Sequence, residues 1–172
     1  NVYTLGIGLS GNPDGDELLV VNPVDDSIYD ATGNEASTSQ GNNAVYLNDK
    51  VVPIITSVAL ASDNSTIAVT FSEAVYNATG GSGALEVGDF GFSITGGTAT
   101  LTSTTPSSIS ISGNVYTLGI TLTGIPDGSE VLTVSPKDDS IYDGDDNEAS
   151  TSQNNNSVTL NDNTVPTVTS VS

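Results

Sequence analysis

The sequence contains no cysteine, no histidine, no methionine and no tryptophan. Without cysteine and histidine the chain cannot form a disulfide, a zinc site of the usual ligands, or a hydrolase relay that pairs serine or cysteine with histidine. We therefore expect no enzymatic activity, and we expect burial of apolar side chains alone to hold the core together.

Basic side chains are scarce as well. Lys and Arg together number 2 against 21 Asp and Glu, which gives a formal net charge of −19. Two cationic side chains cannot neutralise the phosphates of a nucleic acid, and the excess of carboxylates is repelled by an anionic membrane surface. No apolar run approaches the roughly 20 residues that span a bilayer. The sequence therefore predicts neither nucleic-acid binding nor insertion into a membrane.

What the chain does contain is an internal repeat with an offset of 113 residues. The first seven residues, Asn-Val-Tyr-Thr-Leu-Gly-Ile, recur from Asn114, and the match continues without a gap to Ser172. Of the 59 aligned positions, 40 are identical. A period of this length suits one ordinary domain per repeat. We therefore interpret the chain as about one and a half tandem repeats.

Two equivalent prolines set the boundaries between repeats. Pro53 and Pro166 each follow an Asn-Asp segment and are expected to mark domain junctions. We predict that residues 1–50 are the C-terminal half of one repeat, residues 51–163 a complete repeat, and residues 164–172 the first strand of the next. A half-sandwich exposes its inner face, so either the sequence is a window on a longer tandem chain or another copy completes the open half. The single strand at 164–172 supplies too little to replace a half, which favours the window.

Apolar and polar residues alternate with a period of two through the complete repeat, which is typical of strands with one buried face. The inward positions are Val58 and Leu60; Ile67, Val69 and Phe71; Phe90, Phe92 and Ile94; Ala99 and Leu101; Ile109 and Ile111; Tyr116, Leu118, Ile120 and Leu122; Leu132 and Val134; and Val158 and Leu160. The longest predicted strand runs from Tyr116 to Leu122, and all three phenylalanines are expected in the core. About seven to eight short strands predict an all-β, immunoglobulin-like antiparallel sandwich of two sheets.

Several motifs carry a resemblance to a known family. They are Val69-Thr70-Phe71-Ser72-Glu73-Ala74-Val75, the strand start Asp89-Phe90, and the Asp-x-x-Gly-Asn turn from Asp30 to Asn34. Together they resemble bacterial immunoglobulin-like domains, and the Asn-Asp-Asn-Thr-Val-Pro segment at 161–166 is similar to the linkers of cadherin-type repeats. The resemblance implies tandem sandwiches (Big or cadherin-like) of the kind found in secreted adhesins and cell-surface proteins, and hence an extracellular or cell-surface location.

The most distinctive chemistry lies in two acidic loops. Six carboxylates fall between Asp138 and Glu148, and four between Asp25 and Glu35. Calcium takes six to eight oxygen ligands, which clustered Asp, Asn and backbone carbonyls supply. In a sandwich the end of the second strand, this loop and the incoming linker lie at one pole, so we expect a calcium site at the domain junction. The candidate ligands are Asp49, Glu73, Asp138, Asp139, Asp143 and Asn147, with Asp25, Asp26, Asp30 and Asn34 in the equivalent loop of the partial repeat.

A simpler interpretation of the acidic loops is a solvated surface that keeps an extended protein soluble. The recurrence of Asp139, Asp143, Asn147 and Asp162 at matching positions of both copies favours calcium.

The leading hypothesis for function is mechanical. Near-identical repeats that pack only against themselves and their neighbours suit an adhesin stalk or a surface or matrix filament. The expected partners are neighbouring repeats and other copies in a filament. One alternative is a recognition module that binds a glycan or protein receptor through loops at one pole. Another is a spacer domain in a large secreted enzyme.

Overall fold

The computed structural model describes residues 2–171 and divides the chain into two compact units between Val51 and Val52. Both units are built from antiparallel strands, and the predicted all-β class is confirmed. The first unit contains β1 (Leu18–Val20) and β2 (Ala44–Tyr46). The second unit contains β3 (Ile55–Leu60), β4 (Thr66–Phe71), β5 (Phe90–Thr95), β6 (Thr100–Leu101), β7 (Ile109–Ser112), β8 (Val115–Gly119), β9 (Leu122–Thr123), β10 (Val131–Pro136) and β11 (Ser157–Thr159). A single 3-10 turn, η1 (Val87–Asp89), precedes β5.

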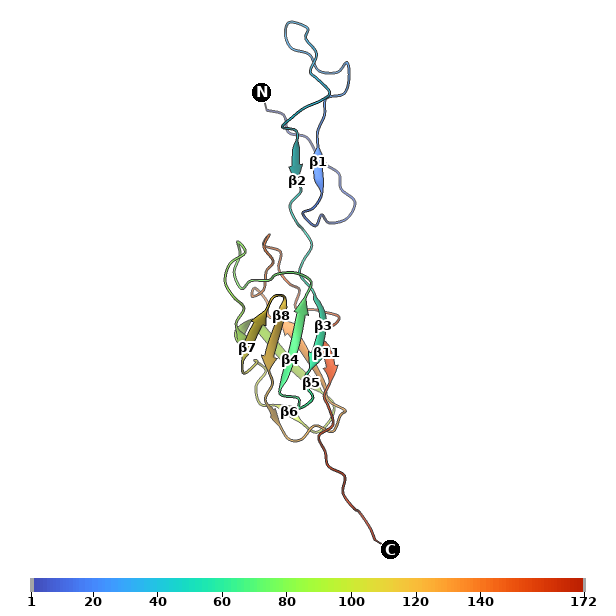
Figure 1. The fold of residues 1–172 in the computed structure, drawn as a ribbon, viewed down its shortest axis with the longest axis vertical. Helices are drawn as coiled ribbons and strands as arrows, with labels where there is room; N and C mark the ends of the chain where they lie inside the picture. Colours follow the sequence, from blue (N-terminus) through green and yellow to red (C-terminus); the bar gives the residue numbers. More distant parts are fainter. Residues whose placement is uncertain (1, 172) are drawn as a thin grey trace. The chain divides into compact units, whose positions relative to one another are not determined.

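The second unit has two main sheets, with strand orders β3-β4-β8-β7 and β11-β10-β5, and a small third sheet of β6 and β9 (Figure 1). The register aligns apolar residues across strands, as in the pairs Ile67 with Leu118 and Leu132 with Ile94. Each main sheet therefore presents one apolar face, since alternate residues of a strand point to the same side. Strands from residues 52–113 and from residues 114–163 are neighbours in both sheets, so the two halves of the repeat depend on each other.

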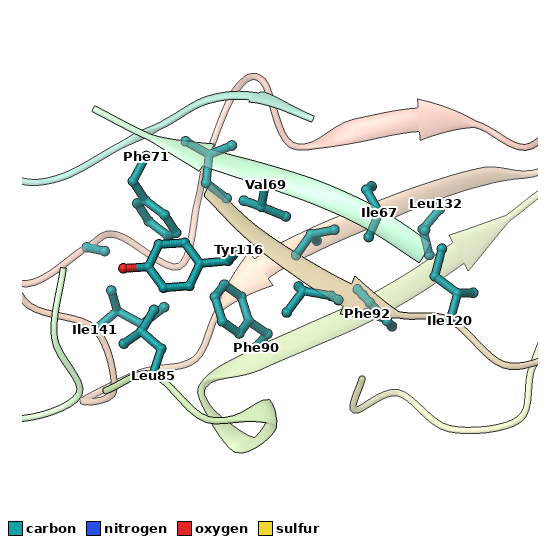
Figure 2. Close-up of a cluster of buried hydrophobic side chains, with 14 of the residues drawn as sticks. Ile67, Val69, Phe71, Leu85, Phe90, Phe92, Tyr116, Ile120, Leu132 and Ile141 are labelled. Carbon is teal, nitrogen blue, oxygen red and sulfur yellow. The ribbon is translucent and has the colours of Figure 1, made fainter. Parts of the chain in front are cut away.

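The core of the second unit lies between the inner faces of the two main sheets (Figure 2). The rings of Phe71, Phe90 and Tyr116 gather at one end, with Tyr116 perpendicular to Phe71 at a centroid distance of 5.6 Å. Phe71, Phe90 and Phe92 are all buried, which confirms their predicted place in the core. Burying each such side chain stabilises the fold by about 1.5–3 kcal/mol.

The prediction of one long strand from Tyr116 to Leu122 is wrong, because the chain changes sheets at Gly119. Strand β8 ends at Gly119, and β9 at Leu122 pairs with β6 in the small sheet. A Cβ on residue 119 would lie 2.4 Å from the Ser108 hydroxyl and 2.5 Å from the Ser107 hydroxyl, so any larger residue at this close crossing would force these side chains to move. Ile120 then donates its N–H to the Ser65 carbonyl oxygen (2.8 Å).

Ile111 was predicted to face inward but is exposed. It belongs to β7, the edge strand of the four-stranded sheet, where the core ends. Its neighbour Ile109 is partly buried and packs against the core cluster.

In the first unit, β1 and β2 pair in the register Leu18 with Tyr46, Leu19 with Val45 and Val20 with Ala44. The second unit repeats this register 113 residues later, from Val131 with Thr159 to Thr133 with Ser157. Residues 2–9 form no strand, although their counterparts make up β8 and the start of β9. Residues 164–171 form no strand either, so their expected role as the first strand of a following repeat stays a prediction.

Candidate functional site

The acidic loop of residues 138–148 connects β10 to β11 and is organised around the buried carboxylate of Asp143. Asp143 Oδ1 accepts hydrogen bonds from the backbone N–H groups of Asp145 and Asn147, both at 2.8 Å. Asp143 Oδ2 accepts a third from the side-chain amide of Asn147, also at 2.8 Å. A short carboxylate that receives nearby backbone N–H groups fixes a turn, which is the usual role of Asp in such loops.

A second carboxylate closes the loop from its other side. Glu148 Oε1 accepts the backbone N–H of Asp139 at 2.7 Å, and Asp139 lies in the left-handed region with a φ of 54°. Asp138 and Asp139 themselves are exposed. The carboxylates of Asp138 and Asp139 therefore face solvent, whereas the carboxylate of Asp143 accepts the hydrogen bonds that form the turn.

Backbone contacts hold the acidic loop against the segment that follows β4. Tyr76 and Tyr142 exchange reciprocal backbone hydrogen bonds of 2.7 and 2.8 Å. The N–H of Gly80 donates to the Asp146 carboxylate. These contacts place a carboxylate oxygen of Glu73 within 4.8 Å of one of Asp143. The sequence-based expectation that the end of the second strand meets this loop therefore agrees with the geometry of the second unit.

The loop of residues 25–35 in the first unit has the same local structure. Asp30 Oδ1 accepts the backbone N–H groups of Thr32 (2.8 Å) and Asn34 (2.9 Å), and Glu35 Oε1 accepts that of Asp26 (2.6 Å). Asp25, Asp26, Asp30 and Asn34 are all exposed here. Because the loop keeps its conformation in a unit with no counterpart of residues 52–113, its own sequence is sufficient to specify it.

Hydrogen bonding also stabilises the charged form of Asp30. The Asn34 side-chain amide and backbone N–H, together with Thr32, hold the pKa of Asp30 well below its usual range. Donors that satisfy the charged form of a carboxylate favour that form. Asp30 therefore carries its negative charge throughout the physiological pH range.

The remaining candidate, Asp49, belongs to the first unit. Its Oδ1 accepts the backbone N–H of Val51 at 2.7 Å. This bond closes an Asx-type turn just before the end of the unit.

Sequence reasoning missed a second buried acid of the second unit, Glu130. Its side chain is fully buried, and Glu130 Oε1 accepts the backbone N–H groups of Thr98 and Ala99, both at 2.9 Å. Glu130 Oε2 accepts those of Asp127 (3.1 Å) and Gly128 (3.2 Å). The sequence carries one indication of this role, because a Pro-Asp-Gly turn followed two residues later by Glu occurs in both copies.

Comparisons with protein-family models, with curated proteins and with solved structures gave no match to this chain. No helix among residues 2–171 has the length and apolar character needed to cross a bilayer. The function is therefore argued from the repeat and from the acidic loops.

Replacing Asp143 by alanine is expected to reduce the free energy of unfolding of the second unit by about 2 kcal/mol, because three donors lose a charged acceptor. Asp145→Ala is the matched control, since residue 145 is exposed and its counterpart is Thr32; it should change stability by less than about 0.5 kcal/mol. Urea unfolding followed by the methyl signals of Leu132 measures both variants. Equal effects would show that Asp143 does not organise the loop.

Proposed function

We propose that this chain is a structural, extracellular tandem-repeat protein of the bacterial immunoglobulin-like kind, part of an adhesin stalk or a surface or matrix filament. The observation that carries the proposal is the repetition of both sequence and local structure at an offset of 113 residues. In addition to the strand register, the two acidic loops share their turn-forming hydrogen bonds. A protein that repeats a self-contained packing unit is suited to span distance.

Two features of the second unit support the immunoglobulin-like assignment. The main sheets have four and three antiparallel strands, and their inner faces share one core. A sandwich of about seven strands with alternating inward residues is the architecture of this class. The edges of such sheets also offer unpaired backbone groups through which copies could associate in a filament.

We further propose that calcium binds at the acidic loop of residues 138–148 and stiffens the linkers between repeats. Glu73 and Asp143 bring carboxylate oxygens within 4.8 Å of each other, and the exposed Asp138 and Asp139 belong to the same loop. Carboxylate and amide oxygens are the ligands that calcium prefers, and a divalent cation offsets the repulsion between clustered acids. The net charge of −19 makes this compensation useful in a concatenated chain.

A calcium titration tests the binding step. We expect millimolar calcium to shift the backbone amide signals of Glu73, Asp143 and Asn147, with a Kd of about 10⁻⁴–10⁻³ M, as is typical of extracellular calcium modules. Glu73→Gln should weaken binding at least about fivefold, whereas Asp63→Asn removes one charge outside the loop and should leave the Kd unchanged. Signals that do not move up to 10 mM calcium (about ten times the weakest expected Kd) would contradict the calcium part of the proposal.

Small-angle scattering on a protein of three repeats tests the mechanical step. With calcium the maximum dimension should be long and the profile that of a rigid rod, and with chelator the profile should become that of a flexible chain. If the two profiles coincide, the acidic loops are solvated surface and do not stiffen the protein.

A further inference from the structure

The first unit exposes the residues whose counterparts form the core of the second unit. Tyr3 is 80% exposed while its counterpart Tyr116 is 3% exposed, and Leu5 is 64% exposed while Leu118 is 0% exposed. The same holds for Ile28, which is 53% exposed against 0% for Ile141. Exposed apolar residues that gather on one surface mark an interaction site, and Tyr3, Leu5 and Ile28 line one pocket. We call the surface formed by Tyr3, Leu5, Ile7, Val21 and Ile28 the open face.

The second unit shows what covers the equivalent surface. Strand β8 pairs with β4 on one side, in the register Leu118 with Ile67, and with β7 on the other, in the register Leu118 with Ile109. Strand β10 pairs with β5 in the same way. All three covering strands come from residues 52–113, the first half of the repeat, and the first unit contains no counterpart of that half.

The open face contains a pocket, and the second unit shows which side chains would fill it. It is open, mostly apolar and lined by Tyr3, Leu5, Ser27, Ile28 and Tyr29. In the second unit the counterpart of Tyr3, Tyr116, packs against Phe71 and Phe90, with ring centroids 5.6 and 6.2 Å away. Both phenylalanines belong to the first half of the repeat. The pocket therefore has the chemistry to receive two aromatic side chains.

The Glu17 carboxylate supplies a hydrogen-bond acceptor in the first unit. Its counterpart Glu130 accepts two local N–H groups, from Asp127 and Gly128, and two from the first half, Thr98 and Ala99. Glu17 Oε2 accepts the local N–H of Asp14 at 3.1 Å, which matches the bond of 3.1 Å from Asp127 to Glu130. In the first unit Glu17 is exposed. One of the local hydrogen bonds of Glu130 is thus reproduced at Glu17, whereas the first unit contains no counterparts of the donors Thr98 and Ala99.

The strand pair and the acidic loop of the first unit are already arranged as in the second unit. The pairing of β1 with β2 reproduces that of β10 with β11 residue for residue. This part of the first unit needs little further ordering on binding, whereas residues 2–6, which form no strand in the free unit, must be ordered.

We propose that the open face of the first unit binds a further copy of the first half of the repeat, a segment with the chemistry of residues 52–113, joined in line ahead of residue 1. In the bound state residues 2–6 form a strand between the counterparts of β4 and β7. The counterparts of Phe71 and Phe90 enter the pocket beside Tyr3, and Glu17 accepts the N–H groups that correspond to Thr98 and Ala99. This proposal goes beyond the proposed function and does not depend on calcium or on filament formation.

The in-line connection follows from the hairpin between β7 and β8. Ser112 pairs with Val115, so only Gly113 and Asn114 lie between these strands, and Gly113 has a φ of 57°. A two-residue turn with a positive φ is the usual connection of a tight hairpin. A segment ending in the same glycine reaches the open face with the smallest loss of loop entropy, whereas a segment from a second chain would first have to leave its own repeat.

The test extends the full chain with one additional copy of residues 51–113 directly ahead of residue 1, and measures hydrogen exchange by NMR without calcium. We expect the amides of residues 2–6 to become protected by on the order of 1,000-fold, as for a core strand of a small domain.

The matched control carries aspartate at the two added positions that correspond to Ile67 and Phe71, which leaves length and connectivity unchanged and should give no protection. The methyl signals of Leu132 and Val134 report that the second unit remains folded in both proteins. Exchange of residues 2–6 that stays as fast in the extended chain as in the original, with those methyl signals intact, overturns the proposal. Loss of calcium binding would leave this result unaffected, so the two proposals fail separately.

Discussion

Leu118→Ala is expected to lower the free energy of unfolding of the second unit by about 3 kcal/mol, whereas Leu5→Ala should lower the stability of the chain by less than about 0.5 kcal/mol. The two leucines occupy the same position of the repeat and have the same neighbours in sequence. Leu118 is fully buried and packs in the core, while Leu5 is exposed. Truncating a buried leucine removes its transfer free energy and leaves a cavity, and neither loss occurs at an exposed site.

Urea unfolding of the two variants measures this difference, followed by the methyl signals of Ile67 and Leu132 for the second unit and of Leu19 for the first. A comparable loss of stability for Leu5→Ala would show that the open face is packed in solution. A loss below about 1 kcal/mol for Leu118→Ala would contradict the core described here.

Glu130→Gln is expected to lower the melting temperature of the second unit by roughly 10 °C, because the amide nitrogen cannot accept the N–H groups that the carboxylate oxygen accepted. Glu130 receives backbone N–H groups from Thr98, Ala99, Asp127 and Gly128, so the substitution leaves some of these donors without an acceptor. Glu17→Gln is the matched control at the equivalent position of the first unit. Since Glu17 is exposed, its substitution should change the melting temperature by about 2 °C at most.

The effect of Glu130→Gln should depend on pH with a predictable sign. The hydrogen bond from Ala99, with those from Thr98 and Asp127, lowers the pKa of Glu130 from its ordinary value of 4.5 to about 2, although burial acts in the opposite direction. A carboxyl group whose pKa is lower in the folded state contributes stability that is fully present above the unfolded pKa and is lost as pH falls through the folded pKa. The difference in melting temperature between the parent and Glu130→Gln should therefore be constant above pH 5 and shrink between pH 4.5 and 2.

Calorimetry of the parent and both variants from about pH 2 to about pH 7 provides this profile, because that range includes both the ordinary pKa of 4.5 and the lowered pKa of about 2. Taking the difference between proteins removes the contribution of the other carboxylates, which titrate in the parent and the variants alike. A difference that grows as the pH falls would mean that Glu130 is destabilised by its burial and is not an anion held by backbone donors.

The all-β class could be predicted from sequence because alternation is a local signal with a direct physical meaning. Ile67, Val69 and Phe71 alternate with polar residues, and a strand turns such a pattern into one apolar face. The turn in the acidic loop is local too, since Asp143 accepts the backbone N–H groups of residues only two and four positions further along the chain. Features that depend only on nearby residues can therefore be predicted from the sequence.

Features that depend on distant residues could not be predicted in this way. Gly119 stands within an alternating run that predicts one strand, and the change of sheet there is visible only in the pairing of β8 with β4 and β7 and of β9 with β6. Glu130 resembles an ordinary surface acid until Thr98 and Ala99 are brought against it. Ile111 alternates correctly, but its exposure depends on where the opposing sheet ends.

The pairing of β4 with β8 has a consequence for how such a chain is synthesised. In that pairing Thr70 lies opposite Val115, a separation of 45 residues. At about 5–20 residues per second, a ribosome takes roughly 2–9 seconds to produce the intervening chain. During that interval the apolar face of β4 has emerged without its central partner, and contacts between segments this distant in sequence form slowly. Each repeat must therefore pass through a period of aggregation risk during translation, which ends when its own β8 becomes available.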